Sequence, residues 1–254
     1  MCEVPNRDVI LAGLQRELPV NILESFYLHD LHDRSRNIGL VIIDEVNGFC
    51  KPGAGNLAPV APDAVIDKMI SLTNALALNF SDHNLPILVL CDTHAANRPE
   101  PPYPPHCIEG TGEEELVDQL QWLVRPSAKR LHVTVINKNC INGFIGGLTP
   151  VSNQVKDWVD FEEIEVMIVV GICTDICDLQ FVQTVLSARN HGLLGNLEDV
   201  VIVAPACATY DLPLEVVRAI SLPDTAAHPR DITQHLGLYL MQSSGAILVN
   251  DLIF

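Results

Sequence analysis

The sequence predicts a single-domain α/β protein built on a doubly wound, mainly parallel sheet of six strands, with helices on both faces. Two observations lead to this fold class. Short apolar runs rich in Val, Ile and Leu recur along the chain, and such runs are typical of strands buried on both faces, as in parallel sheets. Segments with helical periodicity separate these runs, and strands that alternate with helices indicate a doubly wound sheet.

The six predicted strands are the apolar runs themselves. In the first of them, IGLVIID, only the last residue, Asp44, is charged. The runs occupy residues 38–44, 86–92, 131–137, 165–171, 199–204 and 245–250.

Three segments between these runs carry helix signals. In PDAVIDKMISLTNALAL, Pro62 stands where a helix would begin, and proline is favoured at the first helical position. Residues 113–123, EEELVDQLQWL, begin with three glutamates, which the dipole of a helix favours in its first turn. A third helix is predicted to start at Thr174 and to stop at Gly192.

Residues 1–36 differ from the rest of the chain because they are charged and irregular. We interpret them as an N-terminal extension with one short helix, and we place the single domain at residues 37–254. The segment RPEPPYPPH, residues 98–106, holds five prolines in nine residues. Its composition predicts a stiff, extended loop and not a flexible linker.

Composition and charge exclude several classes of protein. The chain has 15 basic and 32 acidic residues, which argues against nucleic acid or an anionic membrane as a partner. No apolar stretch approaches the ~20 residues that span a bilayer, and the first residues lack the core of a signal peptide. Eight cysteines in 254 residues are too few for a disulfide scaffold. These features predict a cytoplasmic protein.

Polar residues follow four consecutive predicted strands. Asp44 ends the first strand, Asp92 and His94 follow the second, Lys138 follows the third, and a cysteine-bearing turn follows the fourth. In an open α/β sheet, ligands bind beyond the carboxyl ends of the strands. A single polar residue at a strand end often only meets solvent, so the prediction of a site rests on the convergence of all four.

Two cysteines, Cys173 and Cys177, lie in the stretch VVGICTDICD. A lone cysteine is usually a small buried hydrophobe, and this spacing is not that of a thioredoxin-like pair. Cys177, however, falls in the first turn of a predicted helix, where the helix terminus and a nearby Lys138 would lower the pKa of its thiol. Asp44 could exchange its proton, and backbone N–H groups of the turn could hold an oxyanion. We predict that Cys177 is a nucleophile and that Cys173 belongs to the turn.

A metal site is predicted beside this nucleophile. Asp92 and His94 alone are a weak signal, because acids and histidines commonly end strands. The stiff proline loop, however, returns His106 to the same edge of the sheet, and two imidazoles with one carboxylate suit Zn²⁺, Mn²⁺ or Fe²⁺. Glu100 in that loop could add a ligand or contact one. We interpret the remaining histidines as structural: His32, His83, His132, His191, His228 and His235.

Four segments resemble the signature segments of the isochorismatase-like cysteine hydrolases, and specifically of the nicotinamidases. They are VIIDEVNGFC, CDTH with YPPHCIEGT, NKNCINGF and VVGICTDIC. The resemblance continues through LSARNHG, ACATYDLPLE and AHPRDITQHLGLYL, and so covers about residues 36 to 245. These later segments are most similar to the plant-type nicotinamidases.

The resemblance implies a role for each matching residue. It implies a catalytic triad of Asp44, Lys138 and Cys177. It implies that one divalent cation is bound, with zinc as the first choice and manganese or iron as alternatives. The implied ligands are Asp92, His94, His106 and, as in some members, Glu100.

The same resemblance assigns the surroundings of the reacting group. The backbone N–H groups of Cys173 and Cys177 would form the oxyanion hole, with a cis peptide before Cys173. Phe49 and Tyr103 would flank a pyridine ring, and Asn47 would order the site. The sequence departs from the family pattern at two positions that could reshape substrate preference, Asp178 and Ile141.

The implied activity is hydrolysis of nicotinamide to nicotinate and ammonia through a thioester, a step of NAD salvage. Acceptance of pyrazinamide and assembly into a homo-oligomer are also expected. The alternatives are a metal-independent ureido or carbamoyl amidohydrolase of the same superfamily, an isochorismatase-type ether hydrolase, and a non-catalytic binding or redox protein on this fold.

Overall fold

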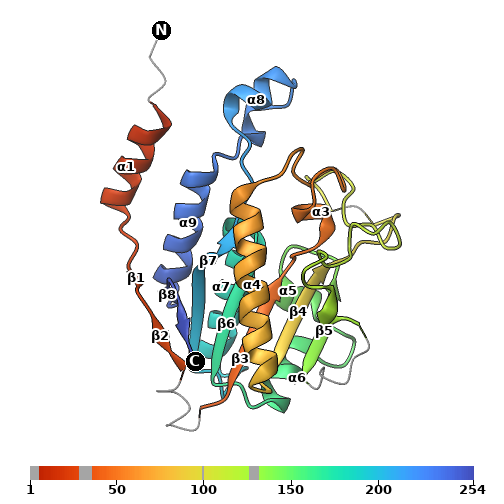
Figure 1. The fold of residues 1–254 in the computed structure, drawn as a ribbon, viewed down its shortest axis with the longest axis vertical. Coiled ribbons are helices and arrows are strands. Elements are labelled where there is room, and N and C mark those ends of the chain that lie inside the picture. The colour runs from red at the N-terminus through yellow and green to blue at the C-terminus, as the bar shows by residue number, and fades with distance from the viewer. Residues whose placement is uncertain (1–5, 29–35, 99, 126–131) are drawn as a thin grey trace.

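A parallel sheet forms the centre of the computed structural model, which describes residues 6–28, 36–98, 100–125 and 132–254. Within these residues seven strands pair in the order β1-β8-β7-β6-β3-β4-β5, and every pair is parallel. The predicted doubly wound α/β fold is confirmed (Figure 1). The strands are β1 (Ile22–Leu23), β3 (Ile38–Ile43), β4 (Ile87–Asp92), β5 (Val133–Lys138), β6 (Val166–Ile172), β7 (Asp199–Ala208) and β8 (Ile247–Val249).

The predicted count of six strands is wrong, because β1 from the N-terminal segment extends the sheet. Ile22 pairs with Leu248 of β8. A strand of two residues leaves no apolar run in the sequence, so no pattern could reveal it. A small second sheet joins β2 (Phe26–Tyr27) to β9 (Leu252–Ile253). The division of the chain at residue 36 stays a prediction, and residues 1–5 and 29–35, with His32, lie outside the described residues.

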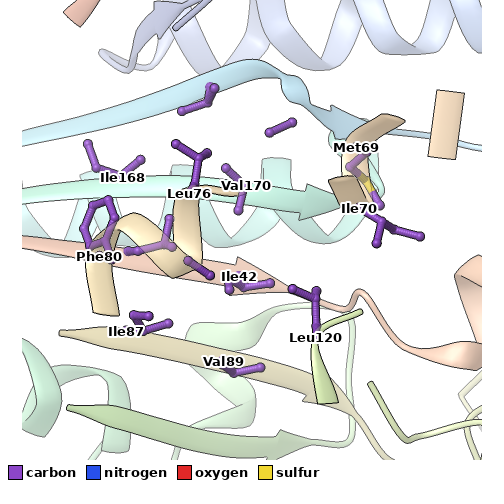
Figure 2. Packing of buried hydrophobic residues seen from close by; sticks show 14 of the residues in the cluster. Ile42, Met69, Ile70, Leu76, Phe80, Ile87, Val89, Leu120, Ile168 and Val170 are labelled. Atoms are coloured by element: carbon purple, nitrogen blue, oxygen red, sulfur yellow. The ribbon is translucent and has the colours of Figure 1, made fainter. Parts of the chain in front are cut away.

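Helices cover both faces of the sheet because the side chains of its buried strands alternate between them. In β3, Leu40 and Ile42 belong to the core under α4 (Ala64–Asp82), whereas Val41 and Ile43 belong to the core on the opposite face. Figure 2 shows side chains of α4, Phe80 among them, lying over the strands. The opposite face is covered by α5 (Gly143–Gly146), α6 (Gln154–Phe161), α7 (Leu179–Asn190) and α9 (Arg230–Ser243).

Helix α1 and five short helices complete the structure of the described residues. In Figure 1, α1 (Arg7–Glu17) runs beside α9 at the edge that carries β1. The others are short: α3 (Asn47–Cys50), η1 (Gln121–Leu123), η2 (Thr174–Asp178), α8 (Leu214–Ala219) and η3 (Asp224–Ala226). Among the described residues no helix combines the length and the apolar content needed to cross a membrane.

Two of the helix predictions need correction. Helix α4 begins at Ala64 and not at Pro62, because the side chain of Asp63 accepts the N–H of Val65 at 3.0 Å and caps it. The segment 113–123 is a loop that becomes helical only in η1. Its glutamates accept hydrogen bonds from loop N–H groups instead of starting a helix. Glu113 accepts the N–H of Cys107 at 2.9 Å, and Glu114 accepts two glycine N–H groups.

Candidate active site and metal centre

The three predicted triad residues converge at the carboxyl end of the sheet. Asp44 follows β3, Lys138 ends β5, and Cys177 lies in η2 after β6. The Lys138 ammonium is 2.8 Å from an Asp44 carboxylate oxygen and donates to the carbonyl of Cys140 at 3.0 Å. Burial raises the pKa of the Asp44 carboxyl, and a hydrogen bond with the Cys177 thiol lowers it in part, so the thiol lies next to Asp44. All three side chains are buried, so their charges act through a medium that screens them little.

Local backbone geometry brings these residues together. Asp44 adopts a left-handed conformation, with a φ of +55°, which turns the chain sharply at the end of β3. Non-glycine residues hold such conformations where the surrounding structure fixes them, often at functional sites. Gly171 has a φ of +144°, and a Cβ there would lie 2.3 Å from the carbonyl oxygen of Ile43. Only glycine therefore lets β6 end beside β3.

The turn that carries Cys177 is wider than a normal helical turn. The Ile172–Cys173 peptide is cis, as the resemblance implied. The carbonyl of Cys173 accepts the N–H of Ile176 at 2.9 Å and that of Asp178 at 3.2 Å, so η2 opens as a π-type turn before α7. The predicted helix starts at Thr174 and has ended before Gly192, as expected.

Lys138 is the positive charge around which the acids are arranged. Burial would lower the pKa of its amine, but Asp44, Cys177 and Asp92 outweigh this and hold that pKa well above its usual range. Lys138 is therefore a fixed cation. Burial also raises the pKa of Asp44 to about 6, because the attraction of Lys138 offsets only part of the desolvation. A carboxyl with this pKa can take and return a proton near neutral pH.

The expectation that the pKa of Cys177 is lowered is wrong for this structure. Burial raises the pKa of the thiol well above its usual range, and Lys138 only partly opposes this because Asp44 and Asp92 add negative charge. The exposed fraction of Cys177 is 8%, so its sulfur has little water to stabilise a thiolate. The resting pair is therefore a thiol beside a carboxylate, and the thiol needs Asp44 to remove its proton.

The predicted metal ligands also meet at one point. One donor atom from each of four residues lies within 4.8 Å of all the others: Asp92, His94, Glu100 and His106. The Oδ2 atom of Asp92 is 3.0 Å from Nε2 of His94 and 3.1 Å from Nε2 of His106. Glu100 Oε2 is 3.7 Å and 3.6 Å from the same two nitrogens. This set of two imidazoles and two carboxylates fits a divalent transition metal or zinc.

Neighbouring groups orient these donors. The Nδ1–H of His106 donates to the carbonyl of Pro104 at 2.8 Å, which leaves Nε2 for a ligand. Glu100 Oε1 accepts the N–H of Ile141 at 2.8 Å, which leaves Oε2. Lys138 donates to Oδ1 of Asp92 at 3.0 Å, which leaves Oδ2. Each of these three residues thus directs one donor atom toward the cluster.

The electrostatics of the cluster favour a shared cation. Burial alone would raise the pKa of Asp92, but Lys138, His106 and His94 together hold it well below its usual range. Burial would lower the pKa of His106, yet Asp92 and Glu100 raise it to about 10. Two carboxylates therefore concentrate negative charge at this point, which favours positive charge between them.

The predicted substrate residues differ in where they lie. The Phe49 and Tyr103 rings lie 5.7 Å and 6.1 Å from the His106 ring, centroid to centroid, so both border the metal cluster. Asn47 is buried, and its amide donates to the carbonyl of Gly112 at 2.9 Å. Asn47 therefore ties the loop after the metal cluster to the segment that follows β3.

Two buried acids directly follow triad residues. The sequence predicts no role for Glu45 and marks Asp178 only as a departure from the family pattern. Glu45 directly follows Asp44, and burial raises the pKa of its carboxyl to about 8, although the Thr73 hydroxyl opposes this. Asp178 directly follows Cys177 and is also fully buried, so its pKa is held well above its usual range. Burial therefore disfavours the ionised form of both side chains, which directly follow triad residues in the sequence. Charged residue types are rarely buried, so only their places next to Asp44 and Cys177 could have marked them.

Comparisons with known proteins identify the family of this chain. The isochorismatase domain family matches residues 39–222. Nicotinamidase 1 from Arabidopsis thaliana is 44% identical over 250 residues, which cover 98% of each chain. The crystal structure of a nicotinamidase from Bacillus subtilis superposes with a TM-score of 0.62 at 21% identity, covering 84% of this chain and 99% of that one.

A second solved structure has the same fold. It is the pyrazinamidase of Pyrococcus horikoshii in complex with zinc, which superposes with a TM-score of 0.58 at 18% identity and covers 86% of this chain and 99% of that one. The family match spans most of the chain, and the plant relative is similar over almost all of it. The chain belongs to the isochorismatase family.

Proposed function

We propose that this protein is a nicotinamidase, which hydrolyses nicotinamide to nicotinate and ammonia. The observation that carries the proposal is that a buried Asp44–Lys138 ion pair faces Cys177 and shares Lys138 with the metal-capable cluster through Asp92. The identity of 44% with the Arabidopsis nicotinamidase along the whole chain supports the same substrate.

In the first step Asp44 removes the proton of the Cys177 thiol, and the sulfur attacks the carboxamide carbon. A C–S bond forms, and the carbonyl electron pair moves to oxygen. Backbone N–H groups of Cys173 and Cys177 are assigned to hold this oxyanion, a contribution worth ~3–4 kcal/mol per donor in other hydrolases. Lys138 stays charged and keeps Asp44 in place.

The C–N bond then breaks. Asp44 returns its proton to the leaving nitrogen, which departs as ammonia, and a thioester to Cys177 remains. Asp44 next takes a proton from water, and the resulting hydroxide attacks the thioester carbon. The C–S bond breaks, the sulfur recovers the proton from Asp44, and the nicotinic acid that forms leaves as nicotinate after losing its carboxyl proton to water. A base with a pKa of about 6 suits both proton transfers.

We assign one divalent cation to Asp92, His94, Glu100 and His106, with zinc as the first choice and manganese or iron as alternatives. The zinc complex of the Pyrococcus pyrazinamidase supports zinc as the first choice of metal. When bound, the cation supplies a Lewis acid that can fix a pyridine nitrogen next to the triad. Phe49 and Tyr103, which border the cluster, are assigned to flank the ring.

The test is ammonia release from a panel of small amides, with and without a chelator. The proposal predicts turnover of nicotinamide and pyrazinamide that the chelator abolishes and that one added cation per chain restores. Turnover of ureido or carbamoyl compounds alone, unchanged by the chelator, would instead identify a metal-independent amidohydrolase. A purified protein that releases no ammonia would be a binding protein on this fold.

We further infer a cytoplasmic homo-oligomer. The seven cysteines within the described ranges are all free thiols, which is typical of proteins in a reducing compartment. Sedimentation of the purified chain would give its assembly state.

A further inference from the structure

A hydrogen-bonded clasp lies beside the turn that carries Cys177. It joins Asp175 of η2, Tyr210 after β7, and His228 before α9. The Nε2 atom of His228 is 2.8 Å from Oδ2 of Asp175, and its Nδ1 atom is 2.9 Å from the carbonyl oxygen of Tyr210. Three segments that are remote in the sequence are thus tied together by one imidazole.

His228 is itself held firmly. Its backbone exchanges two hydrogen bonds of 2.8 Å with Leu212. Its ring stacks on the Tyr210 ring with a centroid separation of 3.9 Å and an interplanar angle of 13°. Both ring nitrogens face acceptors, so each contact is a hydrogen bond when that nitrogen carries its proton. A side chain fixed in this way can hold Asp175 at a defined place.

Asp175 is also confined from its other side. Helix α9 passes so close to η2 that a Cβ on Gly237 would lie 2.9 Å from the Cα atom of Asp175 and 3.0 Å from its backbone nitrogen. Asp175 is therefore enclosed between the backbone of α9 and the ring of His228. The turn has little freedom to move as long as both contacts remain.

The position of Asp175 matters because it lies between Cys173 and Cys177. The N–H groups of these two cysteines are the ones assigned to the oxyanion. Such donors act only if they are aimed at the place where charge develops, and a displacement of ~1 Å can cost 10²-fold in rate. Burial raises the pKa of the Tyr210 hydroxyl, and the charges of Cys173 and Tyr103 raise it further, so Tyr210 lies within electrostatic range of both side chains.

We propose that His228 is a positioning residue: by holding Asp175, it fixes the turn between Cys173 and Cys177 in the geometry that hydrolysis requires. This inference rests on the proposed amide hydrolysis. It goes beyond the interpretation of His228 from the sequence, which gave it only a structural role. The hydrogen bonds of His228 join Asp175, Tyr210 and Leu212 and none of the four metal-capable residues, so loss of the clasp lowers the rate of reaction more than the binding of the ring.

The experiment compares three substitutions at one position. His228→Ala removes both hydrogen bonds. His228→Gln keeps a donor near the place of Nε2 and so can still reach Asp175, whereas His228→Asn keeps a donor near Nδ1 and can reach only Tyr210. We expect kcat for nicotinamide to fall about 10- to 100-fold in the Ala and Asn variants and to be largely rescued in the Gln variant. The dissociation constant for nicotinate and the metal content should not change.

His235→Ala is the matched control, because His235 lies on α9 and bonds to the carbonyl of Leu18, away from η2. Its kcat should equal that of the wild type. If His228→Ala does not fold, Asp175→Ala carries the test, since it removes the oxygen that accepts the hydrogen bond of His228 Nε2; its kcat should fall as far as that of His228→Asn.

Two results would overturn the inference. One is a folded His228→Ala with the kcat of the wild type, even if its Tm is lower, because that is the behaviour of a merely structural residue. The other is equal loss in the Gln and Asn variants. A wild-type protein that releases no ammonia from nicotinamide would instead refute the proposed function, and the inference with it.

Discussion

Two clusters of buried charge meet at the mouth of this site, and they are balanced in different ways. In the triad, the negative charge of Asp44 is matched by Lys138, which the chain itself supplies at 2.8 Å. In the metal-capable cluster, two carboxylates face two imidazoles, and Lys138 reaches only the far oxygen of Asp92. The triad is therefore complete without an added ion, whereas the second cluster gains most from a cation that is not part of the chain.

The comparison is tested most strongly by removing the nucleophile. Cys177→Ala should lower turnover of nicotinamide about 10⁴-fold or more, because no other group at this position can form the thioester. Binding of nicotinate should remain, since the metal cluster and its aromatic neighbours are untouched. Cys173→Ala is the control: it keeps the backbone N–H and should retain most of the turnover. Near-normal turnover by the Cys177 variant would refute its role.

Removal of the Lys138 ammonium, which contacts both clusters, should lower both the stability and the activity of the protein. Lys138→Met leaves Asp44 and Asp92 buried without their partner, and breaking a buried ion pair in this way costs about 3–5 kcal/mol of unfolding free energy. Denaturant unfolding and ammonia release should both show the loss. Lys68→Met, on an exposed position of α4, should leave both unchanged. A stable and active Lys138 variant would contradict the account of the charges.

Removal of a metal donor should affect one cluster only. His94→Ala is expected to lose bound metal and most of the nicotinamide turnover, while alkylation of Cys177 by iodoacetamide continues because the triad is intact. Metal content and alkylation rate are measured on the same sample. His83→Ala serves as control, because His83 lies at the far end of α4 and bonds to Asn79. Unchanged metal content in His94→Ala would show that the ion is held elsewhere.

Acid should switch off the triad through Asp44. Only the carboxylate can take the thiol proton, and burial raises the pKa of Asp44 to about 6. Turnover should therefore be flat above this value and fall about tenfold for each pH unit below it, as the carboxylate is protonated. The profile of kcat/KM against pH for nicotinamide checks this. Full activity at about pH 4.5 would exclude Asp44 as the base.

The smallest effect is expected at Glu100. Glu100→Gln keeps an oxygen for the N–H of Ile141, which the wild-type side chain accepts at 2.8 Å, but removes one negative charge from the cluster. Metal affinity should fall about 10-fold, with the fold and the triad unchanged. Titration with zinc against a competing chelator measures it. An unchanged affinity would show that Glu100 only orders its loop.

The two clusters also differ in how far the sequence could predict them. Asp44 follows β3, and Asp92 and Lys138 end β4 and β5; strand periodicity places such residues at one edge of a parallel sheet. The approach of His106 depends on the path of a loop with little regular structure. The stiffness of this loop could be predicted from its proline content. The point at which the loop brings His106 back to the sheet could not. The neutral state of the Cys177 thiol depends on burial from several elements, which no local pattern records.

The fold itself shows the same limit. Strands buried on both faces, such as β3 and β6, are apolar throughout and could be predicted. The edge strand β1 has two residues and is defined only by its partner β8, so it could not. The glutamates of 113–115 are ambiguous in the sequence, because a carboxylate can cap loop N–H groups as well as it can complement a helix dipole. The contact of His228 with Asp175 joins residues 53 positions apart, beyond the reach of any periodicity.

The most direct test of the two-cluster account is a zinc titration of metal-depleted protein, followed by ammonia release from nicotinamide. The account predicts almost no turnover without the cation and a plateau at one equivalent per chain. Full turnover by the metal-free protein would contradict it.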